Sequence, residues 1–293
     1  MSDVVPLDAA LLRGMPLPSP AEGSKEARGR IAIIGGSAEV PGAVMLAGVA
    51  ALRAGAGKLQ IATVESRAGS LGAAVPEARV LSLPETASGG IDRGCSAMLR
   101  KELARSDALL IGPGMVEEED GYGLAADLLT EIPDAAVVLD AGVLPRLHAY
   151  RGAIERRLGK VVITPHAGEM ANLLEIDREA VESDPLGIAR ALARELQVVV
   201  VMKGSRTFVV EPVGEAWRYE GGGVGLATSG SGDVLGGIVA GLLARGAEAS
   251  QAAIWGVYLH GEAGSSLARS IGPLGFLARE LSGEIPRLMA ACG

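Results

Sequence analysis

One short stretch of the sequence combines residue types suited to transferring a phosphoryl group. Residues 227–235 read ATSGSGDVL and lead directly into a segment with helical apolar spacing. Gly230 and Gly232 let a ligand approach the backbone closely, and the first N–H groups of a helix attract an anion without any cationic side chain. A carboxylate beside such a site costs energy unless it does chemistry, so Asp233 is predicted to accept the proton of a substrate hydroxyl as its oxygen attacks phosphorus. A plain helix cap is the alternative.

Other nucleotide-binding motifs are missing from the sequence. No lysine follows a glycine at the spacing of the phosphate loop GxxxxGK[ST], and residues 35–37, GGS, do not have the GxGxxG spacing of a dehydrogenase. A dinucleotide site of the dehydrogenase type is therefore not expected.

The turn must be positioned by the elements around it, and these alternate along the chain. Strand-like runs are followed by helix-like segments, and the unbroken apolar character of runs such as AVVLD, VVITP and VVVVMKG is typical of a parallel sheet covered on both faces. Strands are predicted at 30–34, 58–64, 78–83, 108–111, 136–139, 160–163, 197–202, 206–211 and 215–219. Helices are predicted at 44–54, 93–104, 123–130, 167–174, 185–195, 232–244, 250–270 and 276–290. The pattern predicts one α/β domain of three layers with a central, mostly parallel sheet over residues 30–293, preceded by a loose or briefly helical arm at 1–29.

In such sheets, ligands bind beyond the carboxyl ends of the strands. The residues there are 35–37 (GGS), 112–114 (GPG), Asp140, 164–166 (TPH) and 203–204 (KG). Lys203 at a strand end favours a phosphate contact over a solvated surface charge, whereas His166 either touches a ligand or caps the next helix. Glu169 is well placed to interact with the first turn of that helix.

Composition narrows the class of partner. The net charge is −8 and no block of five basic residues occurs, which argues against nucleic acid. No apolar run approaches the length of a membrane span, and the first thirty residues do not read as a signal peptide. Cys95 and Cys292 have no metal-ligand spacing and are expected to be free thiols in a reducing, cytoplasmic setting. His148 and His260 have no ligand cluster around them, so no transition-metal site is predicted.

A family resemblance extends the reading of the catalytic turn. Residues 221–246, GGGVGLATSGSGDVLGGIVAGLLARG, resemble the signature of the ADP/ATP-dependent NAD(P)H-hydrate dehydratases, which are ribokinase-like proteins. Residues 163–169 (ITPHAGE) and 201–207 (VMKGSRT) resemble two further motifs of that family. Gly42 and Ala43 before an Ala-rich helix, the 112–114 turn and 258–261 (YLHG) follow the expected order. The resemblance covers roughly residues 30–290.

The resemblance implies removal of water from the hydrated nicotinamide ring of NADHX or NADPHX, with ADP or ATP as co-substrate and Mg²⁺ arriving with the nucleotide. Asp233 would activate the ring hydroxyl, because phosphate leaves more easily than hydroxide does. The implied hydrate contacts are Ala43, Gly114, His166 and Asp233. The implied nucleotide contacts are Lys203, Gly204, Ser205, Arg206, Thr207, Gly230 and Gly232.

Three departures from the family pattern bear on the substrate. Gly142 stands where an acidic residue is usual, Gly222 lies in a run where Asn is common, and an Arg is replaced near Asn172. Two other functions therefore stay open: a kinase of the same fold that phosphorylates a vitamin precursor or a sugar alcohol, and a silent nucleotide-binding regulator. The resemblance also implies a homo-oligomer, and the first thirty residues leave no room for an epimerase domain, so any epimerase partner would be a separate chain.

Overall fold

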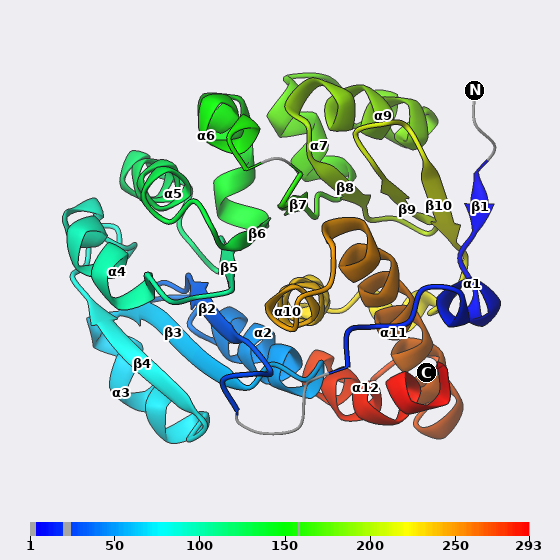
Figure 1. The fold of residues 1–293 in the computed structure, drawn as a ribbon, viewed down its shortest axis with the longest axis horizontal. Coiled ribbons are helices and arrows are strands. Elements are labelled where there is room, and N and C mark those ends of the chain that lie inside the picture. The colour runs from blue at the N-terminus through cyan, green and yellow to red at the C-terminus, as the bar shows by residue number, and fades with distance from the viewer. Residues whose placement is uncertain (1–3, 20–24, 158, 293) are drawn as a thin grey trace.

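The computed structural model describes residues 4–19, 25–157 and 159–292. Ten strands in this part of the chain form one sheet in the order β1-β10-β9-β8-β7-β6-β5-β2-β3-β4 (Figure 1). Every neighbouring pair is parallel except β8–β9 and β9–β10, so the predicted three-layer α/β fold with a mostly parallel sheet is confirmed. The strands are β1 Val5–Pro6, β2 Arg30–Ile34, β3 Lys58–Val64, β4 Ala78–Leu83, β5 Ala108–Ile111, β6 Ala136–Leu139, β7 Val161–Ile163, β8 Val199–Met202, β9 Thr207–Val210 and β10 Ala216–Tyr219.

Helices cover both faces of the sheet (Figure 1). One apolar cluster joins the sheet to α1 Ala9–Arg13, α2 Gly42–Arg53, α3 Glu65–Ala74, α10 Ser231–Ala244, α11 Ala249–Ser270 and α12 Ala278–Cys292. A second cluster joins the other face to α4 Ser96–Leu103, α5 Glu119–Glu131, α6 Arg151–Glu155, α7 Ala167–Leu174, α8 Arg178–Ser183 and α9 Pro185–Leu196. Short 3₁₀ segments η1 Arg93–Cys95, η2 Ala141–Tyr150 and η3 Val224–Leu226 complete the description.

The chain reverses its direction across the sheet between β2 and β5. From β2 it proceeds outward to β3 and β4, then returns to pair β5 beside β2 and continues through β6, β7 and β8. The two loops that follow β2 and β5 meet at this switch point, where Gly36 N donates to Pro113 O at 2.7 Å. Crevices at such points are where open α/β sheets bind ligands.

Helices α2 and α10 approach each other unusually closely. A Cβ atom at Gly237 would clash with the backbone of Ala47, and one at Gly241 would lie 2.6 Å from the carbonyl oxygen of Ala51. Glycine at these two positions therefore lets the backbones touch, which fixes α10 against α2.

The described part of the N-terminal arm is attached to the domain. Val5 and Pro6 pair with Trp217 and Arg218 of β10, and the indole of Trp255 donates to Met15 O at 2.9 Å. Arg245 donates to both Pro18 O and Ala54 O at 3.0 Å each, and so ties the arm to the C-terminal ends of α10 and α2.

One arginine is buried in the helical layer over β5–β7. Arg157 is 2% exposed, and its guanidinium donates to the carbonyl oxygens of Leu128, Leu129, Ile132 and Ala135 at 2.5–3.4 Å. Those carbonyls lie at or just beyond the end of α5, where the helix dipole is negative. Burial lowers the pKa of Arg157 to about 10, so the side chain stays charged at pH 7.

In the described residues, no helix is both long and apolar enough to cross a membrane. Cys95 and Cys292 are free thiols, as expected, and both are buried.

Arg157→Met is expected to lower the free energy of unfolding by about 3 kcal/mol, because it leaves several buried carbonyl groups without donors. Urea denaturation measures the loss, and Arg156→Met, on the exposed side of the same turn, is the matched control. Equal losses in the two variants would contradict the role given to the guanidinium.

Candidate functional site

The predicted catalytic turn begins α10 without a side-chain cap. Gly230 is the N-cap residue with φ 85°, a left-handed conformation that favours glycine, and no side chain accepts a hydrogen bond from the first turn. Ser231 N donates to Thr228 O at 3.2 Å. The helix therefore presents N–H groups and its positive dipole end to any ligand at this position.

Two distant helices hold the turn in this shape. A Cβ atom at Gly230 would clash with the side chain of Leu46 on α2 and lie 3.3 Å from Ala278 on α12. The turn is therefore wedged between α2 and α12, and its backbone has little room to move.

Charged side chains from three neighbouring strand ends meet beside the turn. Lys203, after β8, places Nζ 3.2 Å from Asp140 Oδ1 after β6 and 3.5 Å from Glu169 Oε2 on α7. Asp140 is 2% exposed. Burial lowers the pKa of Lys203, but Asp140 and Glu169 outweigh it and hold the pKa above its usual value, so the ammonium stays charged.

Asp233 stands next to this cluster. Burial raises the pKa of its carboxyl, Asp140 and Glu169 raise it further, and Lys203 opposes them, which leaves the pKa at about 7. A carboxylate with a pKa near the working pH is suited to general-base catalysis. The environment of Asp233 therefore favours the base over the plain cap, since Asp233 caps no backbone N–H here.

His166 caps helix α7. Its Nδ1 accepts from Gly168 N at 3.0 Å and Glu169 N at 3.1 Å, and Glu169 Oε2 returns the bond by accepting from His166 N at 2.7 Å. The backbone of His166 forms a bridge with that of Lys203, so the ring lies beside the charged cluster with its side chain 58% exposed. Glu169 thus takes part both in the cap of α7 and in the ion pair with Lys203.

The structure also brings Ala43 and Gly114 together at the switch point. A Cβ atom at Gly114 would lie 2.9 Å from that of Ala43 and 3.3 Å from Cα of Gly36. Gly114 has φ 66°, so glycine is favoured there by its conformation as well as by space.

A half-buried histidine, to which the sequence assigns no role, contacts the turn from α11. His260 Nε2, on α11, lies 2.9 Å from Ser231 Oγ and 3.0 Å from Ser231 O. Because a carbonyl oxygen only accepts, Nε2 carries the proton. Burial lowers the pKa of His260 to about 4, so the ring is neutral at pH 7.

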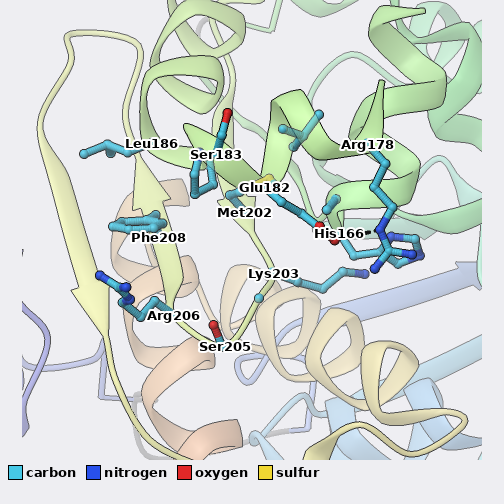
Figure 2. Close-up of a pocket in the computed structure, with 14 residues that line it drawn as sticks. His166, Arg178, Glu182, Ser183, Leu186, Met202, Lys203, Ser205, Arg206 and Phe208 are labelled. Atoms are coloured by element: carbon cyan, nitrogen blue, oxygen red, sulfur yellow. Dashed lines mark hydrogen bonds and ion pairs between the residues drawn. The ribbon is translucent and has the colours of Figure 1, made fainter. Parts of the chain in front are cut away.

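The predicted nucleotide segment forms one wall of a cavity of about 750 Å³ (Figure 2). Residues 203–206 and His166 line one side, and α8 and the start of α9 line the other. Thr207, the last residue of the motif, donates from its hydroxyl to Gly204 O at 3.5 Å.

Two of the three departures from the family pattern have a steric reason. A Cβ atom at Gly142 would lie 2.6 Å from Met115 O, and one at Gly222 would clash with the side chain of Leu226. Gly222 also has φ 81°. Asn172 is exposed on α7, and nothing in the structure explains the residue chosen there.

The sequence pattern puts Asp140 at a strand end but predicts no role for it, and it predicts none for Ser231 or His260. A buried acid after a strand was the available signal for Asp140. The His260 contact joins residues 29 positions apart through helix packing, and no local pattern reports it. No group of three or more His, Cys, Asp or Glu side chains in the described residues is arranged to hold a metal ion.

The mostly parallel sheet, the uncapped turn and the adjacent carboxylate define a nucleotide-dependent enzyme of the ribokinase-like fold. The family model for NAD(P)H-hydrate dehydratase matches residues 31–287, and the chain belongs to this family. The ADP-dependent (S)-NAD(P)H-hydrate dehydratase of Xanthomonas campestris pv. campestris is 51% identical over 96% of this chain and 94% of its own length.

Two further relatives show the range of this family. The bifunctional NAD(P)H-hydrate repair enzyme of Moorella thermoacetica is 39% identical over 92% of this chain, which spans only 51% of that relative. The crystal structure of the ADP/ATP-dependent dehydratase of Bacillus subtilis, co-crystallised with ATP and Mg²⁺, aligns over the whole of both chains with a TM-score of 0.81 at 28% identity.

The Asp233 carboxyl is expected to titrate near pH 7 in the ligand-free protein, because partial burial and the nearby carboxylates of Asp140 and Glu169 disfavour its charged form. Carbon-13 NMR of labelled aspartate would measure this, with the signal assigned by its loss in Asp233→Asn. Asp140→Asn should lower the midpoint and Lys203→Met should raise it, since they remove a like and an opposite charge. An unchanged midpoint in both variants would contradict the coupling.

His260→Phe is expected to raise KM for the nucleotide about tenfold, because it removes the hydrogen bonds that fix the first turn of α10. His260→Asn, which keeps a donor, should recover part of the loss. If the two variants have the same KM and differ only in stability, the contact is structural and does not position the turn.

Proposed function

We propose that this protein converts NADHX and NADPHX to NADH and NADPH, with ADP or ATP as phosphoryl donor. The observation that carries the proposal is the juxtaposition of Asp233, with its raised pKa, and the uncapped start of α10. One group accepts a proton and the other receives a phosphate. Neither a purely structural turn nor a binding-only site needs both.

The first step joins the hydrate to phosphorus. Asp233 takes the proton of the ring hydroxyl as that oxygen attacks the terminal phosphorus of the nucleotide, and AMP or ADP leaves. The backbone N–H groups of Gly230 and Gly232 stabilise the negative charge on the transferred group. Lys203, held between Asp140 and Glu169, supports the donor phosphates together with residues 204–207.

The second step eliminates phosphate, which carries away the oxygen of the former ring hydroxyl. The lone pair of the ring nitrogen expels phosphate by breaking the carbon–oxygen bond, and loss of a proton from the neighbouring ring carbon restores the double bond. Ala43, Gly114 and His166 are proposed to hold the ring. Gly114 packs directly against Ala43 and Gly36, which brings the loops of the proposed ring site together.

The carboxylates at the site fit Mg²⁺ brought by the nucleotide. This ion is usually held by one or two protein carboxylates together with substrate phosphates and water. Asp140 and Glu169 supply two carboxylates next to the turn, both already close to Lys203. Mg²⁺ would neutralise charge on the donor phosphates during transfer.

The assay is incubation with NADHX, Mg²⁺ and either ADP or ATP, read as recovery of absorbance at 340 nm. Recovery with one nucleotide or both supports the proposal and identifies the donor. Nucleotide turnover with another alcohol but not with NADHX would favour a kinase, and tight nucleotide binding without turnover would favour a regulator. Sedimentation of the same sample tests the expected self-association.

Asp233→Asn is expected to bind ADP and ATP as the wild type does and to lower kcat by at least about a hundredfold, because the base is lost while the backbone N–H groups remain. Calorimetry measures binding and the 340 nm assay measures turnover. An Asn variant with near-normal kcat would exclude Asp233 as the base.

A further inference from the structure

A second cavity, of about 410 Å³, lies at the edge of the sheet opposite the catalytic turn. It opens at the first residues of β2, β3 and β4, which lie side by side (Figure 1), whereas the charged cluster beside Asp233 follows the last residues of β6, β7 and β8. The basic residues in its lining are Lys25, Arg30, Lys58, Arg79 and Arg105, and the acidic ones are Glu77 and Glu102. In a chain whose net charge is −8, this cavity therefore concentrates positive charge away from the site described above.

Parallel pairing puts three of these cations on one face of the sheet. Arg30 and Lys58 are register partners at the starts of β2 and β3, and Gln60 of β3 is the partner of Arg79 on β4. Register partners point to the same face, and so do residues two apart on one strand, such as Lys58 and Gln60. Like charges directly opposite each other destabilise a sheet, so Arg30 and Lys58 need a counter-charge.

Ion pairs within the protein compensate two of the strand cations. Arg79 Nη2 lies 2.7 Å from Glu102 Oε2, and Lys58 pairs with Glu26. Both pairs lie at the rim of the cavity and leave its centre to the remaining arginines.

The guanidinium groups of Arg30 and Arg105 have no acidic partner in the part of the chain that the structure describes. Asp107 is close to Arg30, but its Oδ2 accepts from the backbone N–H of Arg30, at 2.7 Å, and not from the side chain. Arg30 is half-buried and Arg105 is exposed, so one guanidinium lies within the cavity and the other at its mouth. Together they offer several N–H donors to an anion.

The lining also limits the kind of anion. Its one apolar side chain is Leu59, which is 3% exposed, and it contains no aromatic ring on which a base could stack. Guanidinium groups instead bind phosphate oxygens in pairs. We propose that this cavity binds a compact polyanion with at least two phosphate groups and no base, held between Arg30 and Arg105. The proposal does not depend on the proposed function, because the two sites share no residue.

Calorimetry with inorganic pyrophosphate tests the proposal. The protein is first saturated with ADP, without Mg²⁺, so that the phosphoryl-donor site is occupied and the pyrophosphate stays free. Arg105→Gln is expected to weaken pyrophosphate binding about tenfold, the loss of one charge-assisted hydrogen bond. Lys101→Gln is the matched control, because Lys101 is also an exposed cation near the end of α4 but lies outside the cavity. Equal binding by the two variants, or no binding to the wild type, overturns the proposal.

Arg30→Gln is the second variant and should weaken pyrophosphate binding to a similar extent. Thermal unfolding without pyrophosphate checks that each variant is folded. If Arg105 serves only the negative end of α4, Arg105→Gln lowers the melting temperature and leaves pyrophosphate binding unchanged, which overturns the proposal. Pyrophosphate that binds only when ADP is absent occupies the catalytic turn and overturns it as well.

Discussion

The ammonium group of Lys203 allows three carboxylates to share one edge of the sheet. Asp140 is almost fully buried, and an isolated carboxylate could stay at such a position only by taking up a proton. With Nζ within 3.5 Å of Asp140 and Glu169, those two acids are compensated directly, while Asp233 beside them is not. The unequal compensation leaves Asp233 with a carboxyl group that titrates near neutrality, next to carboxylates that are paired with a cation.

Parallel pairing is what delivers these groups to one place. Asp140, Glu169 and Lys203 follow β6, β7 and β8, which are adjacent in the sheet, so their side chains meet although 63 positions separate the first from the last. Asp233 comes from a helix instead. The position of Asp233 relative to that edge depends on the contact of α10 with α2, where Gly237 and Gly241 bring the two backbones together.

Much of this architecture is predictable from the sequence, because buried parallel strands are continuous apolar runs and catalytic residues follow them. The strands at 30–34, 58–64, 78–83, 108–111 and 136–139 agree with the structure residue for residue. Two other elements are not predicted. Helix α3, ESRAGSLGAA, has two glycines and no clear apolar stripe, and the two-residue strand β1 is too short to show a period. The Lys203 pairings and the His260 contact depend on tertiary packing, which no local pattern encodes.

The way in which Gly230 is enclosed bears on how such a site can be transplanted. Its left-handed backbone is held by Leu46 and Ala278, its neighbour Ser231 by His260, and each comes from a different helix. The local sequence GSGD supplies glycines and a carboxylate, but the surrounding helices supply their geometry. Grafted alone onto the loop of another α/β protein, the tetrapeptide would keep its residue types but lose the fixed backbone conformation that an anion site needs. Transferring this turn to another protein would therefore require the four helices α2, α10, α11 and α12, and not only the four residues.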